Sequence, residues 1–173
     1  AGLQFNHKVD RFLGSNLITV GFEYLSDDVL DKISAYNYLI DQKVGTFGFL
    51  AQSDWDVTAR LNLLAGARID NHSLLENIVL SPRISVLYKW TQETQFRMSY
   101  STGFRAPQAF DADMHIAFAG GGVSRIILDE NLKQERSKSF SASVNYDRVQ
   151  DIYIYGFTIE GFFTYLDDTF YQD

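Results

Sequence analysis

The strongest constraint on the fold of this chain is a period-two alternation of apolar and polar residues between positions 80 and 107. One side of the two alternating segments carries Ile84, Val86, Tyr88 and Trp90, followed by Phe96, Met98 and Tyr100. The other side carries Arg83, Ser85 and Lys89, followed by Gln95, Arg97, Ser99 and Ser101. An alternation of this period indicates β-strands rather than helices. The four-residue turn between the segments predicts an antiparallel hairpin.

The same alternation recurs along the chain and divides it into about eight long strands. We expect these strands at residues 2–12, 16–25, 43–54, 58–71, 81–90, 94–103, 135–147 and 152–166. Short turns can join only neighbouring antiparallel strands. The predicted fold is therefore all-β, an antiparallel up-and-down meander in which each strand pairs with its neighbours in sequence.

The connections between these strands alternate between short turns and long loops. The short turns fall near residues 13–15, 55–57, 91–93 and 148–151, and the long loops at 26–42, 72–80 and 104–134. Periplasmic turns and extracellular loops give outer-membrane barrels this alternation, and strands of about ten residues suit a tilted crossing of the bilayer. Within 26–42 we expect a short helical turn capped by Ser26-Asp27-Asp28, although Tyr36-Asn37-Tyr38 suits a strand extension equally well.

The two faces of the predicted sheet distinguish a membrane protein from a soluble one. We expect one side to carry Phe47, Leu63, Val86, Met98, Val144 and Phe157, and the other Arg68, Arg83, Arg97 and Ser141. A lipid-facing surface excludes charge, because Lys or Arg at the bilayer midplane costs about 2–4 kcal/mol. The charged side then lines a wet lumen. The alternative is a soluble antiparallel sandwich with the same apolar residues in its core.

Composition removes several functional classes. The chain of 173 residues contains no cysteine, so a disulfide scaffold and a thiolate metal site are excluded. Its net charge of −7, without a basic run, argues against nucleic acid as a partner. No apolar segment is long enough for a transmembrane helix, and no signal peptide is present in these residues.

Catalytic and metal-binding patterns are weak. His7, His72 and His115 have no ligand-like spacing, and no nucleophile elbow or phosphate loop is present, so we expect no enzymatic activity and no cofactor. Asp111, Asp113 and His115 alternate in the third long loop and could coordinate a hard cation or a metal complex. Solvated loop polarity is the favoured interpretation of these three residues, and we predict no metal site.

The same loop contains the other candidate binding residues. Arg105 lies two residues after Gly103 and precedes Ala-Pro, and its guanidinium either binds an anionic ligand or bridges loop carboxylates. Gly120-Gly121-Gly122 gives the loop a flexible apex. Because long loops in compact folds are usually functional or disordered, we expect Arg105, Asp111, Asp113, His115 and Arg125 to be available to a ligand.

Several motifs also resemble those of a known family. They are Leu80-Ser81-Pro82-Arg83, Arg97-Met98-Ser99-Tyr100-Ser101, Gly103-Phe104-Arg105-Ala106-Pro107, Asn131-Leu132 and Glu135-Arg136-Ser137, with Ile40-Asp41-Gln42-Lys43 and Leu64-Ala65-Gly66-Ala67-Arg68-Ile69-Asp70 further upstream. This set resembles the TonB-dependent outer-membrane receptors of Gram-negative bacteria, most closely the Bacteroides-type members, over the whole chain.

The resemblance implies an architecture larger than these residues. Such receptors have a barrel of 22 strands blocked by an N-terminal plug domain, and residues 1–173 contain neither a candidate plug nor a TonB box. We therefore expect the chain to be an internal part of one barrel domain. The resemblance implies that the charged face lines a wet lumen or faces the plug. It also implies that Arg105 is able to bridge plug carboxylates, and that Arg105, Asp111, Asp113, His115 and Arg125 are available to the ligand or to the plug. The implied partners of the chain are outer-membrane lipid, the TonB complex acting through the plug, and a scarce ligand, namely an iron chelate, heme or cobalamin. The alternative is a passive or structural eight-stranded barrel that acts as an adhesin or anchor.

Overall fold

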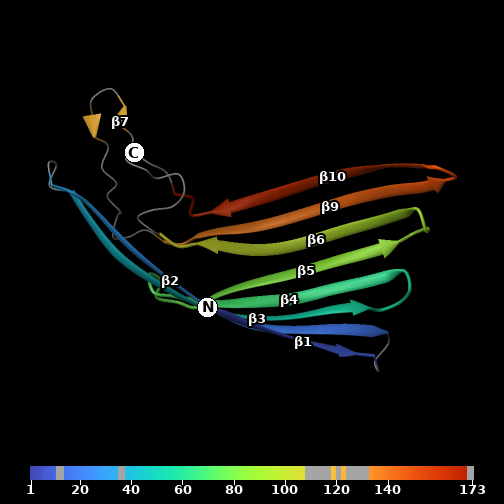
Figure 1. The fold of residues 1–173 in the computed structure, drawn as a ribbon, viewed down its shortest axis with the longest axis horizontal. Coiled ribbons are helices and arrows are strands. Elements are labelled where there is room, and N and C mark those ends of the chain that lie inside the picture. Colours follow the sequence, from blue (N-terminus) through green and yellow to red (C-terminus); the bar gives the residue numbers. More distant parts are fainter. Residues whose placement is uncertain (11–13, 35–37, 108–117, 120–121, 124–132, 171–173) are drawn as a thin grey trace.

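The structure, a computed structural model, describes residues 1–10, 14–34, 38–107, 118–119, 122–123 and 133–170. Eight of its strands form one antiparallel sheet in the order β1-β2-β3-β4-β5-β6-β9-β10 (Figure 1). Their bounds are β1 Gly2–Val9, β2 Ser15–Ile33, β3 Tyr38–Asp56, β4 Leu61–His72, β5 Val79–Lys89, β6 Thr94–Arg105, β9 Glu135–Gln150 and β10 Tyr153–Asp167. A two-stranded sheet, β7 Phe118–Ala119 and β8 Gly122–Val123, lies within the β6–β9 connection. The predicted meander is confirmed.

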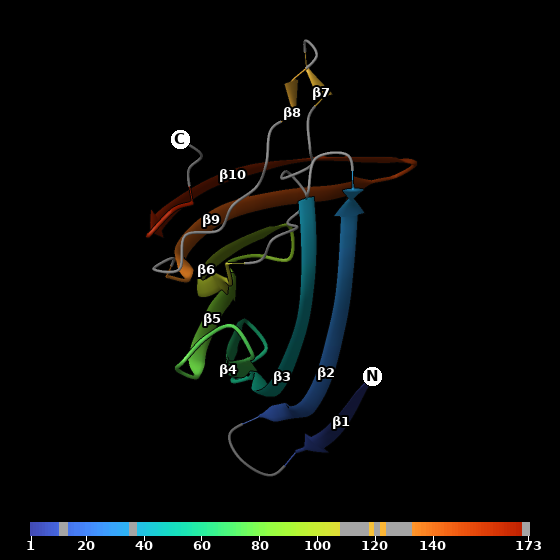
Figure 2. The same ribbon diagram turned by 90° about the vertical axis from the view of Figure 1, so that its left-hand side faces the viewer.

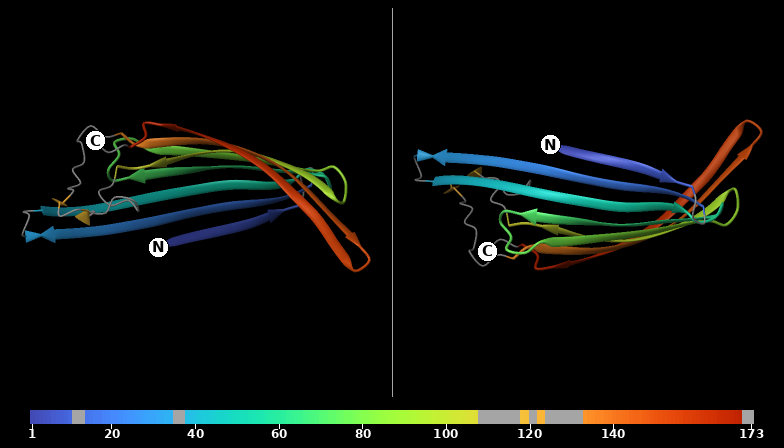
Figure 3. Two further views of the ribbon diagram at one scale, coloured as in Figure 1. Left: turned by 90° about the horizontal axis from the view of Figure 1, so that it is seen from above. Right: turned by 90° about the horizontal axis from the view of Figure 1, so that it is seen from below.

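The large sheet is a curved, open wall. Figure 2 shows the strands following one another around an arc, and Figure 3 shows the twist that carries the β9–β10 hairpin obliquely past the end of the sheet. β1 and β10 are the two edges, and neither pairs with the other in the described chain. The described residues contain no helix long and apolar enough to span a membrane.

The register of the sheet separates its residues into two faces. Directly paired residues lie on the same face, and one row across the sheet runs through Leu63, Val86, Met98 and Ala142. Most apolar residues of the strands lie on this side, which we call the outer face, and most polar residues lie on the opposite side, which we call the inner face. The charged residues of the outer face lie toward the strand ends, as Asp28, Lys43 and Lys138 do. The predicted division of Phe47, Leu63, Val86, Met98, Val144 and Phe157 from Arg68, Arg83, Arg97 and Ser141 is confirmed.

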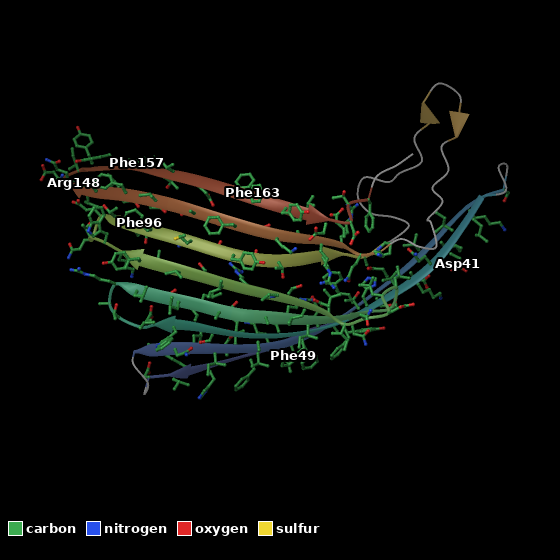
Figure 4. The ribbon with its side chains drawn as sticks, turned by 180° about the vertical axis from the view of Figure 1, so that it is seen from behind. Asp41, Phe49, Phe96, Arg148, Phe157 and Phe163 are labelled. Carbon is green, nitrogen blue, oxygen red and sulfur yellow. The ribbon has the colours of Figure 1, made fainter. Side chains whose placement is uncertain are left out.

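The outer face is an exposed apolar surface without a covering layer. Phe49, Phe96, Phe157 and Phe163 belong to it and are labelled in Figure 4. Phe163 and Phe157 are 66% and 53% exposed, whereas the buried apolar residues of the described chain are limited to Val44, Val79 and Ala106. A sandwich requires a second sheet packed against this face, and the described residues form none. The soluble sandwich considered as an alternative is therefore ruled out.

The β2–β3 hairpin corrects one prediction. The helical turn expected within 26–42 is wrong, because β2 continues to Ile33 and β3 begins at Tyr38. Asp28 lies opposite Lys43, and their side chains form an ion pair of 2.9 Å. β4 pairs with β3 only from Thr46 onward, so Tyr38–Gly45 extends about 26 Å beyond β4 at about 3.3 Å per residue. Asp41 lies in this projecting part (Figure 4).

The opposite end of the sheet carries the short turns. Gly14 precedes β2 with a φ of 109°, and a Cβ at this position would collide with the Asp56 carbonyl oxygen, so the close approach requires glycine. Asp10 accepts a hydrogen bond of 2.8 Å from the Ser15 hydroxyl, and this bond together with Lys8 lowers the pKa of the Asp10 carboxyl. These contacts link the end of β1 to the start of β2 and bring Gly14 close to the end of β3.

Candidate functional site: the inner wall

An arginine on β4 bridges two carboxylates across three strands of the inner face. Glu23, Gly48 and Asp70 lie in one register row on β2, β3 and β4. Arg68 Nε donates to Asp70 Oδ1 and Oδ2 at 2.8 and 3.0 Å, and Arg68 Nη1 and Nη2 each donate to Glu23 Oε2 at 3.2 Å. The guanidinium therefore crosses β3 at Gly48 and ties β2 to β4.

Gly48 provides the space for this bridge. A Cβ at Gly48 would overlap the Arg68 guanidinium and lie 2.8 Å from Asp70 Oδ1. Asp70 is only 2% exposed, whereas the side chain of Arg68 is 37% exposed and that of Glu23 is 44% exposed. The buried carboxylate thus depends on one arginine for its compensating charge.

Two open hollows flank this bridge. The first, of about 300 Å³, is lined by Gly2, Leu3, Gln4, Gly21, Phe22, Glu23, Gly48, Leu50 and Arg68. The second, of about 260 Å³, is lined by Leu25, Asp27, Thr46, Arg68, Asp70, His72, Phe104, Arg105 and Ala106. His72 is 3% exposed, and its Nδ1 accepts a hydrogen bond of 3.2 Å from the Leu74 N–H. Its ring meets Phe104 edge to face with centroids 6.4 Å apart.

The inner face from β5 to β9 has a different character, because it is rich in serine. The residues are Ser81, Ser85, Ser99, Ser101, Ser137, Ser139, Ser141 and Ser143. Ser99 Oγ and Ser141 Oγ are 2.7 Å apart, and Ser139 Oγ lies 3.0 Å from Thr164 Oγ1. Hydroxyl groups both donate and accept hydrogen bonds. The serine side chains of this part of the wall therefore form an uncharged surface that is able to donate and accept hydrogen bonds.

Three positively charged residues, Arg83, Lys89 and Arg97, lie among or next to these serine residues. Arg83 pairs in register with Ser101, Arg97 with Ser143 and Lys89 with Gln95. All three residues are exposed, and none of their side chains forms an ion pair or hydrogen bond with another described residue. These three side chains therefore place positive charge on the inner face beside the serine residues.

The structure describes only one of the predicted binding residues. Arg105 ends β6 at the second hollow, and its Cζ lies 5.5 Å from the centroid of the Phe170 ring. Asp111, Asp113, His115 and Arg125 lie outside the described residues, as do Gly120 and Gly121, whereas Gly122 begins β8. The described chain therefore brings no second predicted residue to Arg105. Its residues also contain no group of three His, Asp or Glu side chains placed to hold a metal ion.

Sequence reasoning placed Arg68 on the polar side but did not connect it with Glu23 and Asp70. The spacing of Arg68 and Asp70 puts both on one face of β4, and this signal was readable from sequence. The contribution of Glu23 depends on the register of two further pairings.

These features define a class of protein. Eight consecutive antiparallel strands with a mainly apolar outer face and a mainly polar inner face are typical of the wall of an outer-membrane β-barrel. The family model described as TonB dependent receptor-like, beta-barrel matches residues 1–173, and the chain belongs to this family. The protein is thus located in the bacterial outer membrane. The family consists of transporters and not enzymes, which confirms the expectation that this chain has no enzymatic activity.

A solved structure shows the same fold. The siderophore receptor PirA from Pseudomonas aeruginosa superposes with a TM-score of 0.73 over 91% of this chain, at 17% sequence identity. The chain spans 30% of the length of that receptor. No curated protein matches the sequence.

Proposed function

We propose that the intact protein is a TonB-energised importer that takes up a scarce ligand across the outer membrane. The observation that carries this proposal is the family match over residues 1–173, and the polar inner wall supports it. In this proposal further strands extend the open edges at β1 and β10 to a closed barrel of 22, and a plug domain outside residues 1–173 fills the lumen and contacts the TonB complex.

The ligand classes in this proposal are iron chelates, heme and cobalamin. PirA is described as a siderophore receptor, which favours an iron chelate among the three. Arg105, at the second hollow, is proposed to contact the ligand or the plug, and Asp111, Asp113, His115 and Arg125 of the 104–134 segment are proposed to do the same.

Deletion of the full-length gene tests the proposal. We expect the deletion strain to lose uptake of at least one radiolabelled probe among a ferric siderophore panel, heme and cobalamin. We also expect that a strain without TonB, but with the receptor present, loses the same uptake. Unchanged uptake of every probe in the deletion strain, or uptake that persists without TonB, would contradict active import.

A loop deletion tests the proposed binding segment. Removing residues 112–128 from the full-length receptor is expected to leave the barrel assembled, because loops on a rigid scaffold change without disturbing its strands. Uptake of the transported probe is expected to fall at least several-fold. Heat-modifiable electrophoretic mobility reports assembly, and labelled uptake reports function. Normal uptake would remove this segment from binding, and loss of the folded form would show that it is structural.

A further inference from the structure

The inner wall is asymmetric in charge. On the β2–β4 side the bridging arginine is already neutralised by Glu23 and Asp70. On the β5–β6 side Arg83, Lys89 and Arg97 have no partner among the described residues. The carboxylates of this second region are few. Glu160 on β10 lies in the register row of Arg97 and Ser143, two strands and about 10 Å from Arg97. Glu135 opposes Arg105 at the long-loop end. Asp147 lies at the short-turn end, as does Glu93, which forms an ion pair with Arg148.

The cations form a series along the strand direction. Arg83 pairs with Ser101, so Arg97 lies four residues from Arg83 along β6 and Arg105 lies four residues away in the opposite direction. Each step is about 13 Å at about 3.3 Å per residue. Lys89 is a diagonal neighbour of Arg97, about 7–8 Å away. The series therefore runs from the long-loop end of the wall to its short-turn end.

Like charges at this separation repel one another, and the serine hydroxyls between them compensate none of that charge. Arginine and lysine donate charge-assisted hydrogen bonds to carboxylate and similar oxyanions. The serines supply uncharged donors and acceptors between successive cations. Such a surface attracts an anionic, oxygen-rich solute and offers it a new cation at each step.

We propose that the inner wall formed by β5, β6 and β9 is the transit surface for an anionic ligand, with Arg83, Arg97 and Lys89 guiding it from the extracellular loops toward the periplasm. This inference rests on the proposed import function and adds that the ligand is a negatively charged chelate, rather than a neutral or cationic one. Arg83 and Arg97 act after capture, so they affect transport rate more than affinity at the cell surface.

The test uses the full-length receptor expressed in the native host from which its own gene has been deleted. The probes are radiolabelled iron as an anionic carboxylate chelate, an anionic catecholate chelate, a neutral trihydroxamate chelate and a cationic trihydroxamate chelate, together with cobalamin. The wild type is expected to import at least one anionic chelate and to discriminate against the neutral and cationic ones. The variant R83Q/R97Q is expected to lower the maximal uptake rate of that probe about tenfold, while the Kd for binding to non-energised cells changes less than twofold.

Two further variants control for charge and folding. K8Q removes one positive charge from the inner face of β1, outside the β5–β9 surface, and is expected to retain uptake. R83K/R97K keeps both charges and is expected to recover at least half of the wild-type rate. If R83K/R97K recovers the uptake rate that R83Q/R97Q loses, the positive charge of these two residues guides the ligand.

Three results would overturn the inference. The first is wild-type uptake of only neutral or cationic probes, which leaves the importer intact but contradicts an anionic ligand. The second is an equal fall of the maximal uptake rate in K8Q and in R83Q/R97Q. The third is that R83Q/R97Q weakens binding to non-energised cells and leaves the maximal uptake rate unchanged. Absence of any energised uptake in the wild type would instead contradict the proposed function itself.

Discussion

Replacing Arg68 with methionine in the full-length receptor is expected to lower the free energy of unfolding by about 3 kcal/mol. Methionine keeps most of the aliphatic stem but removes the guanidinium that bonds both Glu23 and Asp70. Removing one member of a buried ion pair costs about 3–5 kcal/mol, because the other charge stays buried without compensation. We take the lower end, since the Arg68 side chain is 37% exposed and its partner Asp70 only 3% exposed.

The control for this prediction is Arg83→Met on the adjacent strand. Arg83 is exposed and has no partner among the described residues, so the same substitution is expected to change stability by about 0.5 kcal/mol or less. Adding Asp70→Asn to Arg68→Met is expected to recover part of the loss, because it removes the uncompensated charge. Urea unfolding in phospholipid vesicles, followed by tryptophan fluorescence, measures all three. Equal destabilisation by the two methionine variants would show that the bridge contributes nothing specific.

Placing arginine at Val86 is expected to prevent stable insertion of the barrel, whereas arginine at the neighbouring Ser85 is expected to be tolerated. Val86 lies on the outer face between Leu63 and Met98, and Ser85 lies on the inner face between Leu64 and Ser99. A charge on the lipid-facing side near the midplane costs about 2–4 kcal/mol, and a lumen-facing charge remains solvated.

The two substitutions add the same side chain one residue apart on the same strand, so local strand propensity is matched. Heat-modifiable mobility of the full-length receptor in outer-membrane fractions gives the folded fraction. The expected result is loss of the folded form for Val86→Arg and near-normal amounts for Ser85→Arg. The reverse result would mean that the assignment of the two faces is inverted.

The two faces were predictable from sequence because a strand has a period of two. Once Val86 and Met98 were placed on the outside, Arg83 and Arg97 had to lie inside, and the register agrees. The eight strands followed from the same alternation, and the pairing across each short turn followed from its length, since a short turn joins only neighbouring antiparallel strands. These features depend on local patterns, so a single sequence was enough to predict them.

The features that sequence reasoning missed depend on pairing between distant segments. The helical turn expected within 26–42 was wrong because an isolated helical turn is marginal, whereas two strands paired from Ser15 to Asp56 form a continuous ladder. The Arg68 bridge was missed for a related reason. It requires Glu23, 45 residues away in sequence, and a glycine at position 48 between them. Residue types alone do not indicate which positions on neighbouring strands will be opposite one another.

The strand order also has a consequence for how the wall assembles. Since every strand pairs with the one before it, the sheet is able to grow by adding hairpins in the order of the chain. Most of these additions close only a short turn, such as residues 90–93 between β5 and β6. Joining β6 to β9 instead closes residues 106–134, and by chain length alone this closure costs about 2 kcal/mol more in entropy than a four-residue turn. We therefore expect strands β1–β6 and the β9–β10 hairpin to form before β6 pairs with β9.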